Sequence, residues 1–226
     1  MDADLSFDTF RLAASTADLA DEPQAREHAD LVEFRMDLAA DPLSALDDYD
    51  GNLPLLCTNR AAWEGGEADD EGRLAALETA AEHEAVVAVD IEVAAIEDGA
   101  QPTLEHAHDH GAQVVASVHD FAETPEGEEL ARLLARAAAA GDIGKLAVTA
   151  ESRADTLRLL SVTQAMHDEG ATVATMAMGE PGRHTRAVAP LYGSRIGYAP
   201  VDPTDATAPG QYELGTLARL VAELDD

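Results

Sequence analysis

Short apolar or β-branched runs alternate along the chain with longer segments rich in Ala, Leu and Glu. Runs of this length between turn residues are typical of buried strands, whereas the longer segments have the periodicity of helices. We expect eight strands, at residues 10–15, 31–37, 53–60, 86–93, 113–119, 143–149, 172–178 and 195–201. Clear helical patterns cover residues 126–140, 152–169 and 212–224.

This alternation predicts a parallel sheet, because consecutive parallel strands need a helical crossover. Eight units of roughly 28 residues suit a closed (β/α)8 TIM barrel with a helix after each strand. We therefore expect residues 1–226 to form a single α/β barrel domain. An open, doubly wound sheet is the alternative fold. No G-x-G-x-x-G or Walker-type loop follows the first expected strand, which weakens a nucleotide-binding interpretation.

The chain carries 45 acidic and 14 basic residues, a formal charge of −31. Such a surface argues against nucleic acid or an anionic membrane as a partner, since both bind basic protein surfaces. Disorder is disfavoured because 46% of the residues are hydrophobic. An acidic interaction protein is an alternative. The even spread of Asp and Glu favours adaptation to concentrated salt, where a Debye length of about 3 Å at 1 M suppresses self-repulsion.

The single cysteine and the segments near the start of the chain bear on the cellular compartment of the protein. Cys57 is the one cysteine, so no intrachain disulfide can form and a reducing interior is expected. The first residues are acidic and do not form a signal peptide, and no apolar run approaches the 18 or so residues of a membrane span. We expect a soluble, cytoplasmic protein.

Lys145 is the only lysine, against thirteen arginines. It lies in the expected strand 143–149, where burial is costly for an ammonium group. A lysine kept in such a place is a candidate amine nucleophile of the kind that forms Schiff bases with ketones. The alternative is a lysine at a strand end whose amine extends to water.

Charged residues gather toward the carboxyl ends of the expected strands, where barrel enzymes carry their active sites. Glu33 and Arg35 are two residues apart, as are Asp90 and Glu92, so each pair points to one face of its strand. Charges on a barrel-lining face are costly unless they are paired or used. His119 ends the strand before the lysine strand and suits proton transfer at neutral pH. Asp90 or Glu92 could orient it.

The other seven histidines fall on expected helices or in loops, where solvated or helix-end roles are ordinary. His106, His108 and His110 suggest a metal site at first sight. On a helix, however, the middle residue points away from the other two, and no carboxylate that would complete a site is evident. We expect no metal there.

Several segments resemble those of type I 3-dehydroquinate dehydratase, an enzyme of the shikimate pathway. They follow the family order over nearly the whole chain: 33–37, Arg60 with 64–66, 90–92, 117–121, 143–147, 176–179 with Arg186, 193–194 and 207–211. The most specific are His119-Asp120-Phe121, the Lys145 strand, Met176-Ala177-Met178-Gly179 and Ala208-Pro209-Gly210-Gln211.

The resemblance implies a (β/α)8 barrel that uses no metal or organic cofactor and forms a homodimer. It implies a covalent imine between Lys145 and the 3-keto group of 3-dehydroquinate. His119 would take the C2 proton and help to expel the C1 hydroxyl as water, which gives 3-dehydroshikimate. Glu64 is the third catalytic residue that we assign on this basis.

The resemblance also implies a set of substrate-binding residues. Arg186 matches the clamp on the substrate carboxylate. Polar groups that hold the ring hydroxyls and order the site are matched by Glu33, Arg35, Arg60 and Glu64. Thr207 and Gln211 match a closing loop, and Met178 and Ser15 complete the expected set. The chain departs from the family in having Thr207 where Ser is frequent and Tyr198 where Phe is expected, and the Ser15 strand matches loosely.

Two other functions compete with this interpretation. A class I aldolase would share the Schiff-base lysine, but it is disfavoured by the His-Asp-Phe segment and by the lack of a Gly-rich phosphate loop after the seventh and eighth strands. A non-catalytic acidic binding protein would explain the charge, but not the polar strand ends around the only lysine.

Overall fold

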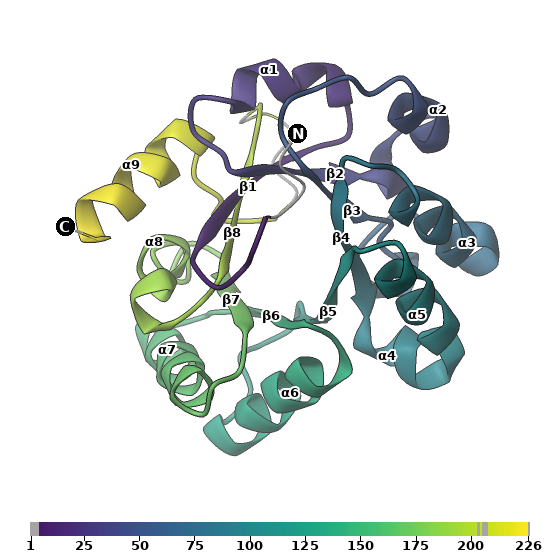
Figure 1. Ribbon diagram of the computed structural model, residues 1–226. Coiled ribbons are helices and arrows are strands. Elements are labelled where there is room, and N and C mark those ends of the chain that lie inside the picture. Colours follow the sequence, from purple (N-terminus) through teal and green to yellow (C-terminus); the bar gives the residue numbers. More distant parts are fainter. Residues whose placement is uncertain (1–4, 203, 205–207, 226) are drawn as a thin grey trace.

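The computed structural model describes residues 5–202, 204 and 208–225. Within these residues, eight parallel strands form a nearly closed barrel with helices around it (Figure 1), which confirms the predicted fold class. The strands are β1 (Arg11–Thr16), β2 (Leu31–Arg35), β3 (Leu55–Thr58), β4 (Val86–Glu92), β5 (Gln113–Asp120), β6 (Ile143–Thr149), β7 (Val173–Met178) and β8 (Ile196–Pro200). No helix in this part of the chain is long and apolar enough to cross a bilayer.

The helical layer is less regular than the strand pattern predicted. Long helices are α3 (Asp70–Ala81), α5 (Gln101–Asp109), α6 (Gly127–Ala140), α7 (Arg153–Asp168) and α9 (Leu214–Asp225). The shorter helical elements are η1 (Leu19–Asp21), α1 (Glu22–Ala25), η2 (Met36–Leu38), α2 (Pro42–Asp47), η3 (Ala62–Glu64), α4 (Val93–Ala95), η4 (Ile96–Ala100), α8 (Thr185–Val188) and η5 (Ala189–Tyr192). A helix follows every strand, as predicted, but α1 after β1 and α8 after β7 span only four residues each.

Strand ends differ from the prediction by a few residues. The second strand stops at Arg35 because η2 begins at Met36, and the third is confined to Leu55–Thr58. Pro54, which has no N–H to donate, precedes the third strand. After it, the Asn59 side chain donates to the backbone carbonyl of Arg73. The segment after β3 brings Glu64 and Gly65 to the pocket at the carboxyl ends of the strands.

The barrel interior changes from apolar to polar along the strands. A lower layer of buried apolar side chains includes Leu31, Leu56, Ala88, Val115, Ile143 and Ala174. Two residues later on the first five of these strands, on the same face, lie Glu33, Thr58, Asp90, Ser117 and Lys145, all buried. The parallel register places Ser117 beside Lys145 and Thr58 beside Asp90. The apolar layer closes the bottom of the barrel and the polar layer faces its mouth.

The barrel is not sealed by a continuous ladder. Strands β8 and β1 pair along their length, but β7 and β8 are joined by a single bridge between Val173 and Ser194 within the described residues. The backbone N–H of Arg195 donates to the carbonyl of Val173, and that of Thr175 donates to the Ser194 hydroxyl. Between β7 and β8, the Ser194 side chain thus accepts a hydrogen bond that a backbone carbonyl would accept in a regular sheet.

Candidate active site

A single pocket at the carboxyl ends of the strands collects most of the expected site residues. Nine of the predicted residues line it: Glu33, Arg35, Arg60, Glu64, His119, Lys145, Met178, Arg186 and Gln211. Ser15 stands behind this lining, and Thr207 lies outside the described residues.

Lys145 reaches into the buried polar layer and is only 5% exposed. Its Nζ donates to Asp90 Oδ2 at 2.9 Å and lies 3.9 Å from Glu33 Oε1. The same atom stands 4.3 Å from the centre of the Tyr198 ring, which is within range of a cation–π contact. The amine therefore does not extend to water, as the alternative interpretation of a lysine at a strand end requires.

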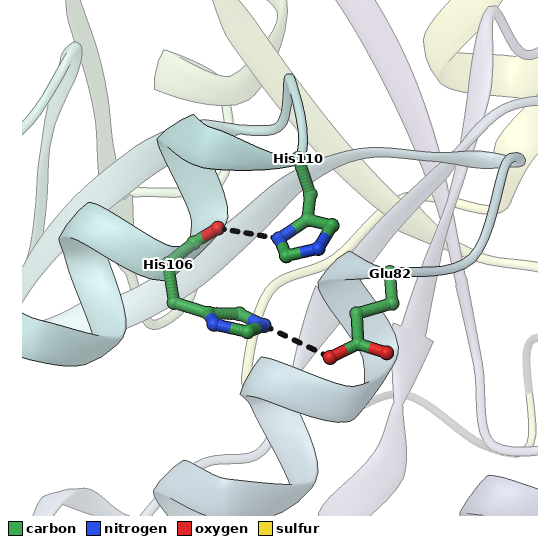
Figure 2. A group of neighbouring side chains, drawn as sticks. All are labelled: Glu82, His106 and His110. Atoms are coloured by element: carbon green, nitrogen blue, oxygen red, sulfur yellow. Dashed lines mark hydrogen bonds and ion pairs between the residues drawn. The ribbon is translucent and has the colours of Figure 1, made fainter.

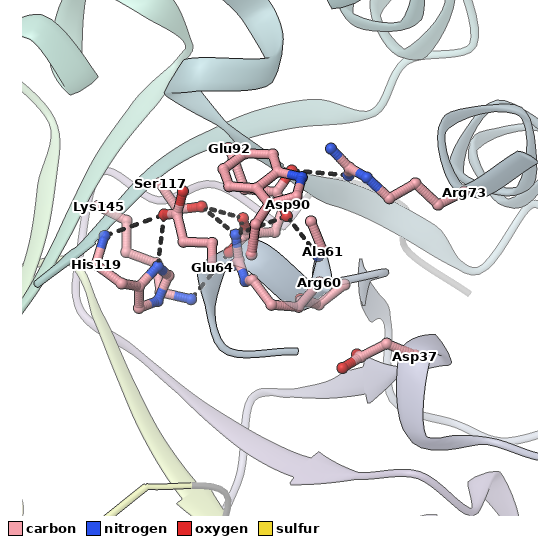
Figure 3. A network of polar contacts seen from close by, with 12 residues as sticks. Asp37, Arg60, Ala61, Glu64, Arg73, Asp90, Glu92, Ser117, His119 and Lys145 are labelled. Carbon is pink, nitrogen blue, oxygen red and sulfur yellow. Dashed lines mark hydrogen bonds and ion pairs between the residues drawn. The ribbon is translucent and has the colours of Figure 1, made fainter. Parts of the chain in front are cut away.

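Asp90 links the amine to a second buried cation (Figure 3). Its Oδ1 accepts from Arg60 Nη2 at 2.7 Å and from the Ser117 hydroxyl at 2.7 Å. Burial acts to raise the pKa of Asp90, but the charges of Arg60 and Lys145 hold that pKa well below its usual value. Asp90 is therefore a permanent carboxylate at neutral pH.

Glu33 is held by two hydroxyl groups from neighbouring strands. Its Oε2 accepts from the Ser15 hydroxyl at 2.5 Å, and its Oε1 accepts from the Thr58 hydroxyl at 3.1 Å. Ser15 thus contacts the pocket indirectly, through Glu33. The two hydroxyls fix the position of the Glu33 side chain beside the Lys145 amine.

His119 is partnered by Glu64, not by Asp90 or Glu92. The His119 ring Nδ1 lies 2.9 Å from Glu64 Oε1, and the same oxygen accepts from the His119 backbone N–H at 3.0 Å. Burial, reinforced by the charges of Arg60 and Lys145, lowers the pKa of His119 well below its usual value. The ring is therefore neutral at pH 7. The sequence-based expectation about its partner is wrong because Glu64 arrives from the loop after β3.

The loop conformation that brings Glu64 to His119 depends on Gly65. Gly65 ends η3 in the left-handed region, with φ of 80°, which glycine adopts without strain. A Cβ at this position would also meet the Phe121 ring. That ring stacks on His119 with centroids 5.7 Å apart, although Phe121 remains 53% exposed. The loop, the aromatic ring and the histidine form one side of the pocket.

Glu92 belongs to a buried network beside the pocket, and Arg73 was not predicted to be part of it. Arg73 Nη1 donates to Glu92 Oε2 at 2.8 Å, and the other Glu92 oxygen accepts from the backbone N–H of Ala61 at 3.0 Å. Arg60 Nη1 lies 3.2 Å from that second oxygen. Arg73 is on α3, and in the sequence it looks like any other arginine of a helix. Its role follows only from its contact with Glu92 in the folded protein.

Arg186 is a buried cation without a close counter-ion among the described residues. It is 4% exposed, and its Nε makes no hydrogen bond within that part of the chain. Burial lowers its pKa to about 10, with partial compensation from Glu33. The guanidinium remains charged at neutral pH. By contrast, Arg35 is paired through two hydrogen bonds with Asp37, at 2.9 and 2.7 Å.

The pocket therefore combines four chemical elements. It offers a primary amine beside a permanent carboxylate, a neutral imidazole held by a second carboxylate, a buried guanidinium able to bind an anion, and side chains that can hydrogen-bond hydroxyl groups. This combination suits reversible amine addition to a carbonyl with proton transfer at the neighbouring carbon. The one His/Asp/Glu group with metal-ligand spacing in the described chain, Glu82 with His106 and His110, lies outside the pocket.

Comparisons with known proteins show the family to which this chain is similar. A family model described as Type I 3-dehydroquinase matches residues 12–225. A 3-dehydroquinate dehydratase from Haloarcula marismortui is 57% identical over 225 residues, which cover 97% of this chain and 98% of that protein. Another from Halobacterium salinarum is 55% identical over 226 residues, covering 97% and 100%. The crystal structure of 3-dehydroquinate dehydratase from Geobacillus kaustophilus has a TM-score of 0.81 at 28% identity, covering 96% and 92%.

Proposed function

The chain belongs to the type I 3-dehydroquinase family, and on this premise we propose that it dehydrates 3-dehydroquinate to 3-dehydroshikimate through a Schiff base on Lys145. The observation that carries the mechanism is the position of the only lysine. Its amine is buried in the pocket, next to Asp90 and on the strand adjacent to that of His119. Arginine, which stays protonated, could not form the imine at this position.

The reaction begins at the substrate ketone. Lys145 gives a proton to His119, and its neutral amine then adds to the C3 carbonyl carbon. The oxygen of the adduct takes one proton from the attached nitrogen and one from the imidazolium and leaves as water, which gives a protonated imine and restores neutral His119. The imine nitrogen is a stronger electron sink than the ketone oxygen, so the proton on C2 becomes easier to remove. Asp90 remains ionised beside this nitrogen and stabilises the positive charge of the iminium.

His119 then moves the proton from carbon to oxygen. Its Nε2 takes the C2 proton, and the electron pair of that C–H bond moves into the C=N system to form an enamine. The imidazolium gives the proton to the C1 hydroxyl, the C1–O bond breaks, and water leaves as the enamine electrons form the C1–C2 double bond. Hydrolysis of the conjugated imine restores Lys145 and releases the enone.

Arg186 supplies the recognition of the substrate's carboxylate. A buried guanidinium whose Nε has no partner among the described residues gains a great deal from a carboxylate, which can accept two parallel hydrogen bonds. Gln211, Met178 and Arg35 line the same pocket and would contact the ring and its hydroxyl groups. Thr207 is proposed to act with Gln211 in closing the site.

The wider setting is proposed on the same premise. The relatives named above at 57% and 55% identity come from halophilic archaea, which supports adaptation of the −31 surface to concentrated salt. A single barrel domain, a homodimer and a cytoplasmic location follow from the family resemblance and the single cysteine. Sedimentation at high salt tests the homodimer independently of the chemistry.

The direct test of the reaction is ultraviolet absorbance on adding 3-dehydroquinate to the protein in concentrated KCl. The conjugated enone of 3-dehydroshikimate should appear with wild type and be absent with Lys145→Met, whose side chain has similar length but no amine. An aldolase would cleave a carbon–carbon bond without forming this enone, and a binding protein would leave the ketone intact. Correctly folded wild-type protein that produces no enone would refute the proposal.

A further inference from the structure

Three potential metal ligands lie together on the helical layer, away from the pocket. Glu82, His106 and His110 offer one ligand atom each, and these atoms all lie within 4.8 Å of one another. Figure 2 shows the three side chains turned toward a common point between two helices. The sequence had suggested that no carboxylate accompanies the histidines. That expectation is wrong, because Glu82 comes from a different helix, 24 residues before His106.

The middle histidine behaves as the helical geometry predicted. His108 points away from the other two, and its Nε2 lies 2.8 Å from Asp142 Oδ2. His106 and His110 are one helical turn apart and face the same way, with ring centroids separated by 4.4 Å. His108 is therefore a built-in control for any property of the other pair.

The hydrogen bonds of the cluster prepare it for a cation. His110 Nδ1 lies 2.9 Å from the backbone carbonyl oxygen of His106, which can only accept, so the hydrogen sits on Nδ1. In the neutral ring, Nε2 then carries the free lone pair, the arrangement usual for a metal-bound histidine. His106 Nε2 lies 3.1 Å from Glu82 Oε1, so a carboxylate already meets an imidazole at the same point.

The two helices are held in register next to the cluster. The buried Thr103 hydroxyl on α5 donates to Glu78 Oε1 on α3 at 2.7 Å. Glu82 follows Glu78 by one helical turn, and His106 follows Thr103 by about one turn. This contact therefore sets Glu82 opposite His106. A tetrahedral ion with bonds of about 2.0–2.1 Å needs ligand atoms about 3.3 Å apart. The three ligand atoms lie within 4.8 Å of one another, so small rotations of these half-buried and exposed side chains would bring them to that spacing.

We infer that Glu82, His106 and His110 form a structural site for a divalent transition-metal ion of the Zn²⁺ type, which joins the carboxyl ends of α3 and α5. Two imidazoles and one carboxylate, with water as a fourth ligand, are a donor set for Zn²⁺ and its neighbours, whereas Mg²⁺ and Ca²⁺ prefer oxygen alone. The site lies just before β4 and β5 begin, at the end of the barrel opposite the pocket. It serves stability, and its occupancy is separate from the chemistry at Lys145.

The test is calorimetric titration of the metal-free protein with Zn²⁺ at pH 7.5, in concentrated KCl with excess Mg²⁺. The Mg²⁺ occupies loose sites on the acidic surface, so only a transition-metal site gives saturable binding. Wild type should bind one equivalent of Zn²⁺ and show a higher Tm. His106→Gln and His110→Gln should weaken binding by about tenfold or more, as loss of a ligand requires. Glu82→Gln should weaken it in the same direction.

His108→Gln is the matched control, because it removes a histidine from the same helix without touching the cluster. It should bind Zn²⁺ as wild type does. All four variants should retain wild-type kcat/KM for dehydration, which shows that they are folded and separates this inference from the proposed activity. Absence of saturable Zn²⁺ binding, or equal weakening by His108→Gln and His110→Gln, would overturn the inference.

Discussion

Glu64 Oε1 receives two hydrogen bonds from one residue, from the backbone N–H of His119 at 3.0 Å and from its ring Nδ1 at 2.9 Å. The backbone N–H can only donate, so this oxygen is an acceptor, and we assign the ring hydrogen to Nδ1. The Nε2 of the neutral ring is then free to take a proton. One carboxylate thus fixes both the position and the tautomer of the proposed base.

Replacing Glu64 separates these two contributions. Glu64→Gln keeps an acceptor oxygen but removes the negative charge that stabilises the imidazolium, so kcat should fall by about 10- to 100-fold. Glu64→Ala removes the acceptor as well and should cost more. Steady-state kinetics of the two variants test this order. Equal activity of Glu64→Gln and wild type would mean that the charge has no part in the reaction.

The pH profile follows from the same pair. Burial raises the pKa of Glu64 to about 7, despite the opposing charge of Arg60. A carboxyl group with a raised pKa is ionised above that value and gains a proton below it, so kcat/KM should fall as pH drops below about 7. The acid side of the profile should shift in Glu64→Gln, which cannot titrate. An unchanged pH profile in Glu64→Gln would mean that another group causes the fall in kcat/KM at low pH.

Asp90 should matter for stability as well as for activity. Asp90→Asn leaves Lys145 and Arg60 buried with less compensation, and loss of one partner of a buried ion pair costs about 3–5 kcal/mol. Chemical denaturation at constant high salt measures the loss in free energy of unfolding. Glu97→Gln is the control, since its pair with Arg136 is on the surface, where solvent screens it, and its loss should change stability little.

Substrate binding should survive the loss of the amine. Lys145→Ala should abolish turnover and still bind 3-dehydroquinate, because Arg186 and the pocket's hydroxyl-binding groups remain. Arg186→Gln, in contrast, should weaken binding by about tenfold or more, as expected when a buried charge-assisted contact is removed. Calorimetric titration of both variants distinguishes the two roles. If Lys145→Ala lost binding and Arg186→Gln kept it, Lys145 and not Arg186 would be the residue that holds the substrate.

Salt should affect the encounter with substrate. A −31 surface repels an anionic substrate in dilute buffer, while the buried arginines keep the pocket locally positive. Screening removes the long-range repulsion first, so kcat/KM should rise with KCl over the range in which circular dichroism shows an intact fold. A flat or falling profile over that range is the opposite of what this account predicts.

The sequence pattern predicted the barrel and its polar interior because both depend on local spacing. A two-residue step places Glu33 and Arg35, or Asp90 and Glu92, on the same side of a strand, whatever the rest of the chain does. The specific partners were not predictable in this way. Glu64 reaches His119 through the loop around Gly65, and Arg73 reaches Glu92 from α3, so both contacts depend on how distant segments meet.

The same limit explains the cluster at Glu82. Helical spacing correctly separated His108 from its neighbours, but the carboxylate comes from the C-terminus of another helix. The sequence pattern predicted a helix after β1 and after β7, but it did not predict how short these two helices are, because counting strands carries no information on helix length. In the second of these, Gly182, Pro190 and Gly193 break up the helical segments.

The central claim is that the amine of Lys145 bonds covalently to the substrate. Sodium borohydride reduces an imine to a stable secondary amine, so treatment during turnover followed by peptide mass spectrometry tests it directly. The account predicts inactivation that depends on 3-dehydroquinate, with the mass of the reduced ligand attached to the peptide at Lys145. Inactivation without an adduct there, or full turnover by Lys145→Met, would contradict it.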